Sequence, residues 1–378
     1  MSKKPRFETV AIQSTEDHFK GVRPATTPIY MSSTYIRNED GTYNEDMIYG
    51  RANNPNRAIL EYSVAQLEGG ARGFAFGSGM AAISAVLQCL SAGDHVLLPH
   101  DIYFGAKNLT AHVLGRWGLQ VTAVNMADLP AVESAITPKT KLIWLESPSN
   151  PLLQITDLSA LISLAQAHGL LTAVDNTWPT PVLTRPIELG ADIVVHSTTK
   201  YFGGHSDVIG GCVVLAKDDA LAERMAEIQH LGGGVPSPFD CWLVTRGIRT
   251  LSLRMKAHCE SAMKIAAYLA QHPRIERVLY PGLPEDSGHA IAKKQMIGGF
   301  GGMISVLVKG DSKKALEISN RLRYFTSATS LGGVESLVEH RRSVEGPASN
   351  APDNLLRLSI GLEHVDDLLE DWEQALSH

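Results

Sequence analysis

From about residue 70 onward, short apolar runs alternate along the chain with longer amphipathic stretches. The apolar runs predict buried strands at residues 73–76, 95–98, 120–124, 141–145, 170–174, 192–195 and 211–215. The amphipathic stretches between most of them, such as 158–168 and 218–231, predict helices. Short buried strands that alternate with helices are typical of a mostly parallel sheet with helices on both faces, so we predict an α/β fold.

The two ends of the chain follow different patterns. After a break rich in glycine and proline at 232–238, we expect a long helix at 251–271, strands at 274–279, 302–308 and 355–360, and a last helix at 365–376. Residues 1–50 are polar and lack clear periodicity. The chain is therefore expected to consist of an N-terminal arm at 1–50, a first domain at 51–235 and a smaller α+β C-terminal domain at 236–378.

Composition narrows the classes of function. Hydrophobic residues make up 44% and charged residues 20% of the chain, as in soluble globular proteins. The net charge is -6 without a long basic run, which disfavours nucleic acid as a partner. The most apolar helical stretch is too short to span a membrane. The four cysteines are scattered without a CxxC pair, so we expect no disulfide framework, no metal site and a cytoplasmic location.

A lysine at the end of a predicted strand is the most informative feature. Strand 192–195 is followed by the hydroxyl side chains of Ser197 and Thr199, by Lys200 and then by glycines. Ligands of open α/β sheets bind at the carboxyl edge, where burial would lower the pKa of Lys200 and make it a nucleophile and a base. The two hydroxyls would bind a phosphate. On this segment alone, an exposed lysine without a function stays the alternative.

Two further segments carry candidate chemistry. Gly77, Ser78, Gly79 and Met80 precede a predicted helix, whose first backbone N–H groups would hold a phosphate. The glycines also fit a dinucleotide fingerprint, but no acidic residue stands near twenty positions further on, so a nicotinamide cofactor is disfavoured. Asp175 follows strand 170–174, where a carboxylate either has a role at the ligand-binding edge of the sheet or caps the next segment.

The run Ser-Thr-Thr-Lys-Tyr-Phe-Gly-Gly-His-Ser at 197–206 resembles the signature of the Cys/Met metabolism family of pyridoxal-phosphate enzymes, and the resemblance extends from residue 27 to 363. The family includes cystathionine γ-synthase, cystathionine β- and γ-lyases, methionine γ-lyase and the O-acyl-homoserine sulfhydrylases. The resemblance implies the fold type I architecture of aspartate aminotransferase, pyridoxal 5'-phosphate as the cofactor, and a small amino-acid substrate. It also implies a homotetramer built as a dimer of active dimers.

The resemblance further implies individual roles. Lys200 carries the cofactor and acts as a base, while Tyr103 stacks on the cofactor ring and exchanges a proton. The other implied cofactor-binding residues are Tyr49 and Arg51, which reach the phosphate of a neighbouring subunit, and Gly79, Met80, Asp175, Ser197 and Thr199. The implied substrate-binding residues are Asn150, Ser330 and Arg357, and Glu335 lies with Ser330 where the family lines the substrate channel. Arg357 stands in an apolar strand and needs a partner, for which a substrate carboxylate is suitable.

The sequence departs from the family where the tail of the substrate is recognised. Asn108 replaces the arginine with which γ-synthases and γ-lyases usually bind a distal carboxylate. Gly105 replaces the usual cysteine of methionine γ-lyases, and Leu331 the tryptophan of bacterial β-lyases. Either Arg341 or Arg342, in an unusual segment, replaces the missing arginine, or the substrate lacks that carboxylate, as canavanine does.

These patterns lead to one expected function and several alternatives. We expect a lyase similar to cystathionine γ-lyase, which cleaves the bond from Cγ, or Cβ, to a heteroatom in a sulfur-containing or other γ-substituted amino acid. A cystathionine γ-synthase or other γ-replacement transferase, a cystathionine β-lyase, and a lyase for methionine or canavanine stay open. From other classes, a nicotinamide oxidoreductase and a cofactor-binding protein without turnover are the alternatives, although the second would not need Tyr103, Asn150 and Arg357.

Overall fold

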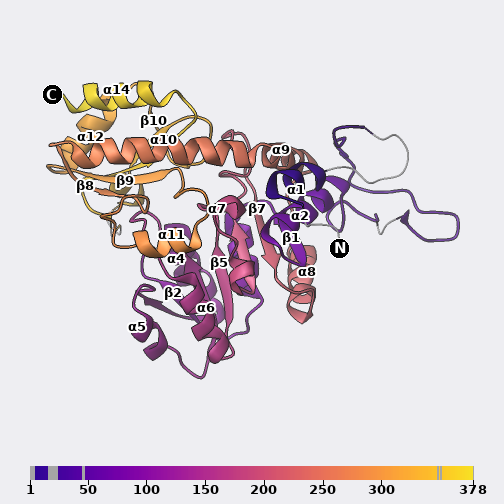
Figure 1. Cartoon of the computed structure of the whole chain (residues 1–378). Coiled ribbons are helices and arrows are strands. Elements are labelled where there is room, and N and C mark those ends of the chain that lie inside the picture. Colours follow the sequence, from indigo (N-terminus) through magenta and orange to yellow (C-terminus); the bar gives the residue numbers. More distant parts are fainter. Residues whose placement is uncertain (1–4, 16–23, 45–46, 347–348, 350, 378) are drawn as a thin grey trace.

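The computed structural model describes residues 5–15, 24–44, 47–346, 349 and 351–377. Its strands form two sheets, one with the order β1-β7-β6-β5-β4-β2-β3 and one with the order β10-β11-β12-β9-β8. In Figure 1 the long helix α10 (Leu251–Gln271) runs along the second sheet toward the first. No helix in the described part of the chain combines the length and apolar character needed to cross a membrane.

The first sheet is mostly parallel, as predicted. Its strands are β1 (Arg72–Phe76), β2 (His95–Pro99), β3 (Gln120–Val124), β4 (Thr140–Glu146), β5 (Leu171–Asp175), β6 (Ile193–His196) and β7 (Gly211–Leu215). Only β7 runs antiparallel to its neighbours, β1 and β6. Each predicted strand is confirmed with its ends within a residue. Because β4, β5 and β6 are parallel neighbours, Glu146, Asp175 and the segment after His196 meet at one carboxyl edge.

Helices cover both faces of this sheet. They are α2 (Pro55–Glu68), α3 (Gly79–Gln88), α4 (Phe104–His112), α5 (Leu129–Ser134), α6 (Leu158–Ala167), α7 (Thr180–Leu183) and α8 (Ala220–Gly232), with 3-10 turns at Leu114–Trp117 and Pro186–Leu189. Along β4, Leu142 and Trp144 are buried in one hydrophobic cluster, while Ile143 and Leu145 are buried in another. Successive side chains of a strand point to opposite faces, so the apolar run of β4 buries both of them.

The second sheet is mainly antiparallel. Its strands are β8 (Ile275–Leu279), β9 (Met303–Val308), β10 (Thr326–Ser327), β11 (Leu337–His340) and β12 (Leu355–Ser359). The accompanying helices are α9 (Pro238–Ile248), α11 (His289–Gln295), α12 (Ser312–Arg321), α13 (Arg341–Glu345) and α14 (Val365–Leu376). β8, β9 and β12 were predicted, whereas β11, with Glu339 and His340 in a strand of four residues, was not. The predicted smaller α+β part is therefore present.

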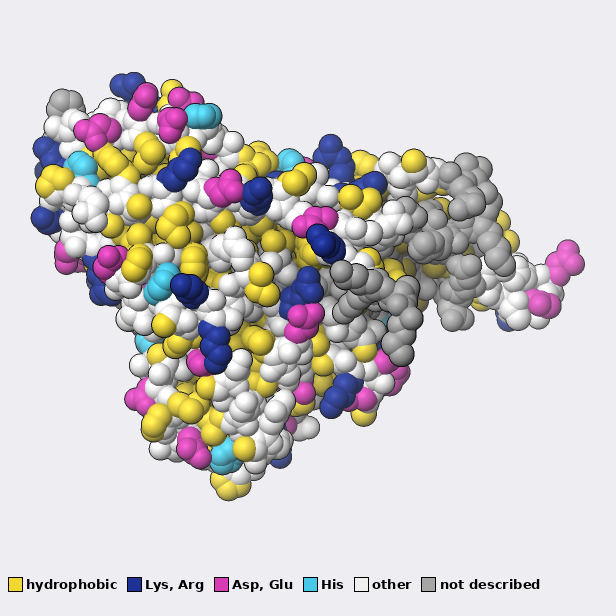
Figure 2. Space-filling view, viewed as in Figure 1, with side chains coloured by type: hydrophobic (Ala, Val, Ile, Leu, Met, Phe, Trp, Pro, Cys, Tyr) yellow, Lys and Arg dark blue, Asp and Glu magenta, His cyan; other side chains and the backbone are white. Residues whose placement is uncertain are grey.

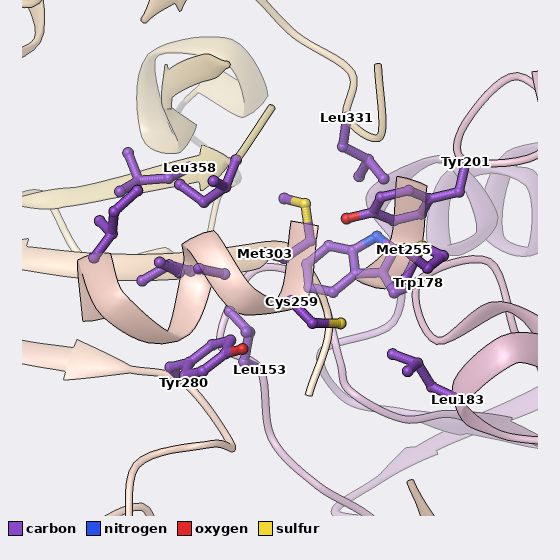
Figure 3. Close-up of a cluster of buried hydrophobic side chains, with 14 of the residues drawn as sticks. Leu153, Trp178, Leu183, Tyr201, Met255, Cys259, Tyr280, Met303, Leu331 and Leu358 are labelled. Atoms are coloured by element: carbon purple, nitrogen blue, oxygen red, sulfur yellow. The ribbon is translucent and has the colours of Figure 1, made fainter. Parts of the chain in front are cut away.

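One hydrophobic core joins the two sheets. It includes Leu153 and Tyr201 from loops of the first part and Met255, Met303 and Leu358 from the second. Figure 3 shows these side chains converging around α10. Because the core is continuous, the boundary near residue 235 does not separate two cores, and the division into domains there stays a prediction.

The N-terminal segment is only partly an arm. α1 (Phe7–Gln13) buries Ala11 in the shared core, with Phe7 and Val10 packed against it. Other described residues project away from the body, and Ile36 is 94% exposed. α1 was not predicted from the sequence, because its apolar positions are too few to reveal a helix. On the face drawn in Figure 2, basic and acidic side chains are interspersed.

Candidate active site

A cavity of about 490 Å³ lies between the carboxyl edge of the first sheet and the second sheet. It brings together every residue with a predicted site role except Tyr49, Arg51 and Glu335. The predicted residues that line it are Gly79, Met80, Tyr103, Asn150, Asp175, Ser197, Thr199, Lys200, Ser330 and Arg357. Segments that are far apart in the sequence therefore form one pocket, and both sheets contribute to it.

Lys200 ends in this cavity as a largely buried amine. Its Nζ donates a hydrogen bond of 2.8 Å to Oγ of Ser330. Burial, reinforced by the positive charge of Arg357, lowers the pKa of Lys200 to about 8. Ser330 has a φ of 82°, a strained value for a serine, which is common at functional sites. Near physiological pH a lysine with this pKa has a much larger neutral fraction than an ordinary lysine, and the neutral amine is the form that acts as a nucleophile or base.

The start of α3 forms one wall of the cavity. The hydroxyl of Ser78 accepts a 3.1 Å hydrogen bond from the backbone N–H of Ala81 and so caps the helix. A Cβ atom at Gly79 would lie 2.9 Å from Cβ of Ser197, so glycine permits the close approach of these two segments. Thr199 uses its hydroxyl to bind the peptide groups of Gly210, whereas Ser197 faces the cavity. A helix N-terminus beside a hydroxyl fits a phosphate group.

Asp175 places a half-buried carboxyl group in the cavity. Burial raises its pKa, and hydrogen bonds from Thr177, including a 3.0 Å bond from its backbone N–H, oppose that shift. A buried carboxylate gains most from a cationic partner, and a protonated pyridine nitrogen is a suitable one. Together, Lys200, Asp175 and the start of α3 fit the amine-binding, ring-binding and phosphate-binding needs of pyridoxal phosphate.

Arg357 lies on the side of the cavity formed by the second sheet. Its Nη1 donates to Oδ1 of Asn150 at 3.1 Å, and its Nη2 donates to the backbone oxygen of Ser330 at 3.1 Å. It also pairs with Glu339, which stands opposite Arg357 in the register of β11 and β12. Burial lowers the pKa of Arg357 to about 10. The expectation that substrate would supply its partner was therefore incomplete, because the protein already provides Glu339.

Arg341 is the second arginine of the cavity. It is 6% exposed, and its Nη1 contacts Oε1 of Glu339 at 3.0 Å. Its Nε contacts Oε1 of Glu345, one helical turn further along α13, at 2.7 Å. Glu339 thus lies between Arg341 and Arg357 and neutralises part of the charge of both. This arrangement holds Arg341 rigidly at the cavity wall.

Arg342 and Asn108 lie elsewhere. Nε of Arg342 contacts Oδ1 of Asp353 at 2.7 Å, and its side chain is 42% exposed. Neither Arg342 nor Asn108 is among the residues that line the cavity. Arg341 and Arg342 were the two candidates for the missing arginine, and the structure places only Arg341 in the pocket.

Tyr49 and Arg51 are close to each other but not to this cavity. The guanidinium of Arg51 lies 5.7 Å from the centre of the Tyr49 ring, and its Nη1 donates to the backbone oxygen of His230 at 2.6 Å. Glu335 accepts a hydrogen bond from Ser206 and lines an adjoining cavity that shares Ser330 with the first. The roles predicted for Tyr49 and Arg51 require a second subunit and stay predictions.

Some residues at the site were not given a role from the sequence. Glu339 was missed because its contact with Arg357 depends on the pairing of β11, which was not predicted. Trp178 lines the cavity beyond β5 and had no distinguishing pattern. Glu146 also lines the cavity. It ends β4 as Asp175 ends β5, so the same strand-end argument would have identified it.

A mostly parallel sheet with a lysine, a carboxyl group and a helix N-terminus at one edge fits a pyridoxal-phosphate enzyme of fold type I. The family model described as Cys/Met metabolism PLP-dependent enzyme matches residues 8–377, and the chain belongs to this family. The enzyme is therefore dependent on pyridoxal phosphate and acts in cysteine and methionine metabolism. When bound, this cofactor condenses with amines and withdraws electrons from the neighbouring carbon atoms.

Similar proteins carry three different names. The chain is 48% identical to a cystathionine gamma-synthase of Mycobacterium tuberculosis over 93% of both chains. It is 43% identical to a cystathionine beta-lyase of Coxiella burnetii over 99% of both chains. A solved structure of cystathionine gamma-lyase from Lactobacillus plantarum, complexed with L-serine, superimposes with a TM-score of 0.93, 42% identity and 99% coverage of both chains. Overall similarity therefore does not separate the three activities.

Proposed function

We propose that this enzyme is a lyase that cleaves the bond between Cγ, or Cβ, and a heteroatom of an amino acid, in the manner of cystathionine γ-lyase. The observation that carries the proposal is the Lys200 amine, which is held by Ser330 on the side of the cavity where Arg357 and Asn150 lie. Arg357 would bind the α-carboxylate of the substrate. Lys200 would then stand near Cα and Cβ and move protons between them.

Two other residues that line the cavity support the departure of the group on Cγ. Tyr103 lines the cavity and is 38% exposed, so its hydroxyl would transfer a proton to the leaving heteroatom. The tail of the substrate would extend toward Arg341, whose guanidinium would donate hydrogen bonds to a distal carboxylate. Since two carboxylates already surround Arg341, that attraction is weaker than at an unpaired arginine.

A substrate panel tests the proposal. The purified holoenzyme would be incubated with cystathionine, homocysteine, methionine and canavanine, and the 2-oxo acid, ammonia and thiol products would be measured. Cleavage of cystathionine at Cγ yields 2-oxobutanoate, ammonia and cysteine, while cleavage at Cβ yields pyruvate, ammonia and homocysteine. Lys200→Ala is the control for products that arise without the enzyme. A holoenzyme that releases no 2-oxo acid from any panel member would refute the lyase proposal.

The second candidate is a γ-replacement reaction, as in cystathionine γ-synthase. The relative that is 48% identical, with that name, supports it. In this reaction the same residues release the Cγ substituent, and a thiol then adds at Cγ. Formation of cystathionine from an O-acylhomoserine and cysteine, faster than formation of 2-oxobutanoate, would favour the transferase over the lyase.

The assembly that we propose is a homotetramer made of two active dimers, located in the cytoplasm. Tyr49 and Arg51 lie away from the cavity of their own chain, which suits a role in the site of a neighbouring subunit. The four free cysteines suit a reducing compartment.

A further inference from the structure

Glu146 is a carboxyl group in the cavity that the proposed reaction does not use. It is the last residue of β4, is 7% exposed and stands opposite Asp175 in the register of β4 and β5. The described residues include no cation in an ion pair with it. Such a buried carboxyl group would be costly as an unpaired anion, so its retention at the site calls for a role.

The side chain of Glu146 contacts the loop that carries Tyr103. Its Oε2 accepts a 3.1 Å hydrogen bond from the backbone N–H of Tyr103. Tyr103 is the residue before α4, and its own side chain makes no capping hydrogen bond. Glu146 therefore holds the backbone from which the tyrosine ring projects.

The ring of Tyr103 lies close against the backbone of Gly105. A Cβ atom at Gly105 would lie 2.6 Å from Cε1 of Tyr103 and 2.9 Å from Sδ of Met80. The ring thus lies over Gly105 and beside the start of α3. A shift of the backbone at Tyr103 would displace the ring from this space.

The surroundings of Glu146 are acidic. Asp175 on β5 and Asp101 in the loop after β2 face it, and both raise its pKa in addition to the larger effect of burial. The pKa lies well above the ordinary value of a glutamate, whereas hydrogen bonds from Thr177 oppose the rise at Asp175. The two carboxyl groups therefore differ in their environment. Burial and the neighbouring negative charges favour the neutral form of Glu146 more strongly than that of Asp175.

We propose that Glu146 is a positioning residue, whose carboxyl oxygen holds the backbone N–H of Tyr103 and thereby places the tyrosine ring in the cavity. A neutral acceptor would also serve, because it keeps an oxygen for the N–H of Tyr103 and adds no second negative charge beside Asp175. The inference rests on the proposed function only for the role of Tyr103 in the reaction.

Three variants of the holoenzyme test this inference. Glu146→Gln keeps a neutral acceptor of the same length, so the circular dichroism of the bound cofactor and the kcat are expected to stay within about twofold of the wild type. Glu146→Ala removes the acceptor, so the cofactor band is expected to change and kcat to fall about tenfold or more, with a smaller change in KM. Glu146→Asp withdraws the carboxyl group by one methylene and is expected to resemble Glu146→Ala, which keeps the test decisive if the alanine variant does not fold. Glu133→Ala, on an exposed side chain of α5, is the control.

Two results would overturn the inference. If Glu146→Gln alters the cofactor band as strongly as Glu146→Ala or Glu146→Asp, the negative charge of Glu146 is what matters. If neither Glu146→Ala nor Glu146→Asp changes the band or kcat, Glu146 does not position Tyr103. The cofactor band is measured without substrate, so a failure of the substrate panel would leave this test intact.

Discussion

Burial makes Lys200 a residue whose charge opposes folding. Its pKa falls from 10.5 to about 8 in the folded protein, with burial as the main cause. Below pH 8 the amine is protonated in both the folded and the unfolded chain, so folding must bury an ammonium group. Between pH 8 and 10.5 the unfolded chain binds more protons than the folded one, so the free energy of unfolding rises with pH over this range.

Replacement of Lys200 by methionine should therefore stabilise the protein without cofactor. At pH 7 we expect Lys200→Met to raise the free energy of unfolding by an amount on the order of 3 kcal/mol at most, because each pKa unit corresponds to about 1.4 kcal/mol. The advantage should shrink as the pH approaches 10.5. Urea unfolding at several pH values measures it, with Lys256→Met on the exposed face of α10 as the control. A stabilisation that does not depend on pH would contradict the proposed cause.

Gly79 should be needed for the cofactor more than for the fold. In Gly79→Ala the new Cβ would lie 2.9 Å from Cβ of Ser197 and push the two segments apart. We expect the Kd for pyridoxal phosphate to rise about tenfold or more, while thermal stability changes little, because alanine favours the helix by about 1 kcal/mol. Gly232→Ala, at the end of α8 where nothing lies near the added atom, is the control. An unchanged Kd would contradict the assignment of this wall to the phosphate.

The position of a residue in the cavity could be predicted from the sequence where that residue follows the end of a strand. Lys200 and Asp175 follow apolar runs, and parallel strands bring such positions to one edge. The sequence did not reveal Glu339 as the partner of Arg357, because that contact depends on the register between two strands, of which one was not predicted. The roles of both residues toward ligands stay predictions.

At the scale of elements, α13 is expected to determine how the substrate tail is recognised. Arg341 lines the cavity and Arg342, the next residue, faces Asp353 outside it. Arg341→Met should lower kcat/KM for cystathionine about tenfold relative to homocysteine, which has no distal carboxylate. Arg342→Met should leave this ratio unchanged. The ratio comes from steady-state kinetics with both substrates.

If cystathionine is preferred by a wide margin and the removal of Arg341 leaves the margin intact, α13 does not recognise the tail. Arg341→Lys separates the loss of charge from the loss of packing, because it keeps a cation next to Glu339 and Glu345.

Elements were predictable when their hydrophobic pattern was long or continuous. The seven strands of the first sheet are buried on both faces and appear in the sequence as apolar runs. α2 was missed, although Asn54 caps it and Pro55 begins it, because the polar composition before residue 70 obscured its apolar face. β11 has only four residues, two of them polar, and takes its place through pairing with β12.

At the scale of the whole molecule, the active site is expected to depend on two subunits. Mixing inactive Arg51→Ala and Lys200→Ala proteins under conditions that exchange subunits should restore about a quarter of wild-type activity, because half of the dimers are then mixed and each has one intact site. Activity assays before and after exchange measure this. No recovery in dimers proven to be mixed, or full activity of a monomer, would contradict the proposal for Tyr49 and Arg51.

The pairing of β1 with β7 also has a consequence for the time at which the protein can fold during synthesis. β1 is the edge of the first sheet and has only β7 as its neighbour, and the contact between Arg72 and Asp218 beside this pair spans 146 positions. At translation rates of roughly 5 to 20 residues per second, roughly 7 to 30 seconds pass between the synthesis of β1 and the synthesis of β7. During this interval the apolar strand is available to chaperones or to other nascent chains, so the yield of soluble enzyme should depend on how quickly the ribosome completes this segment.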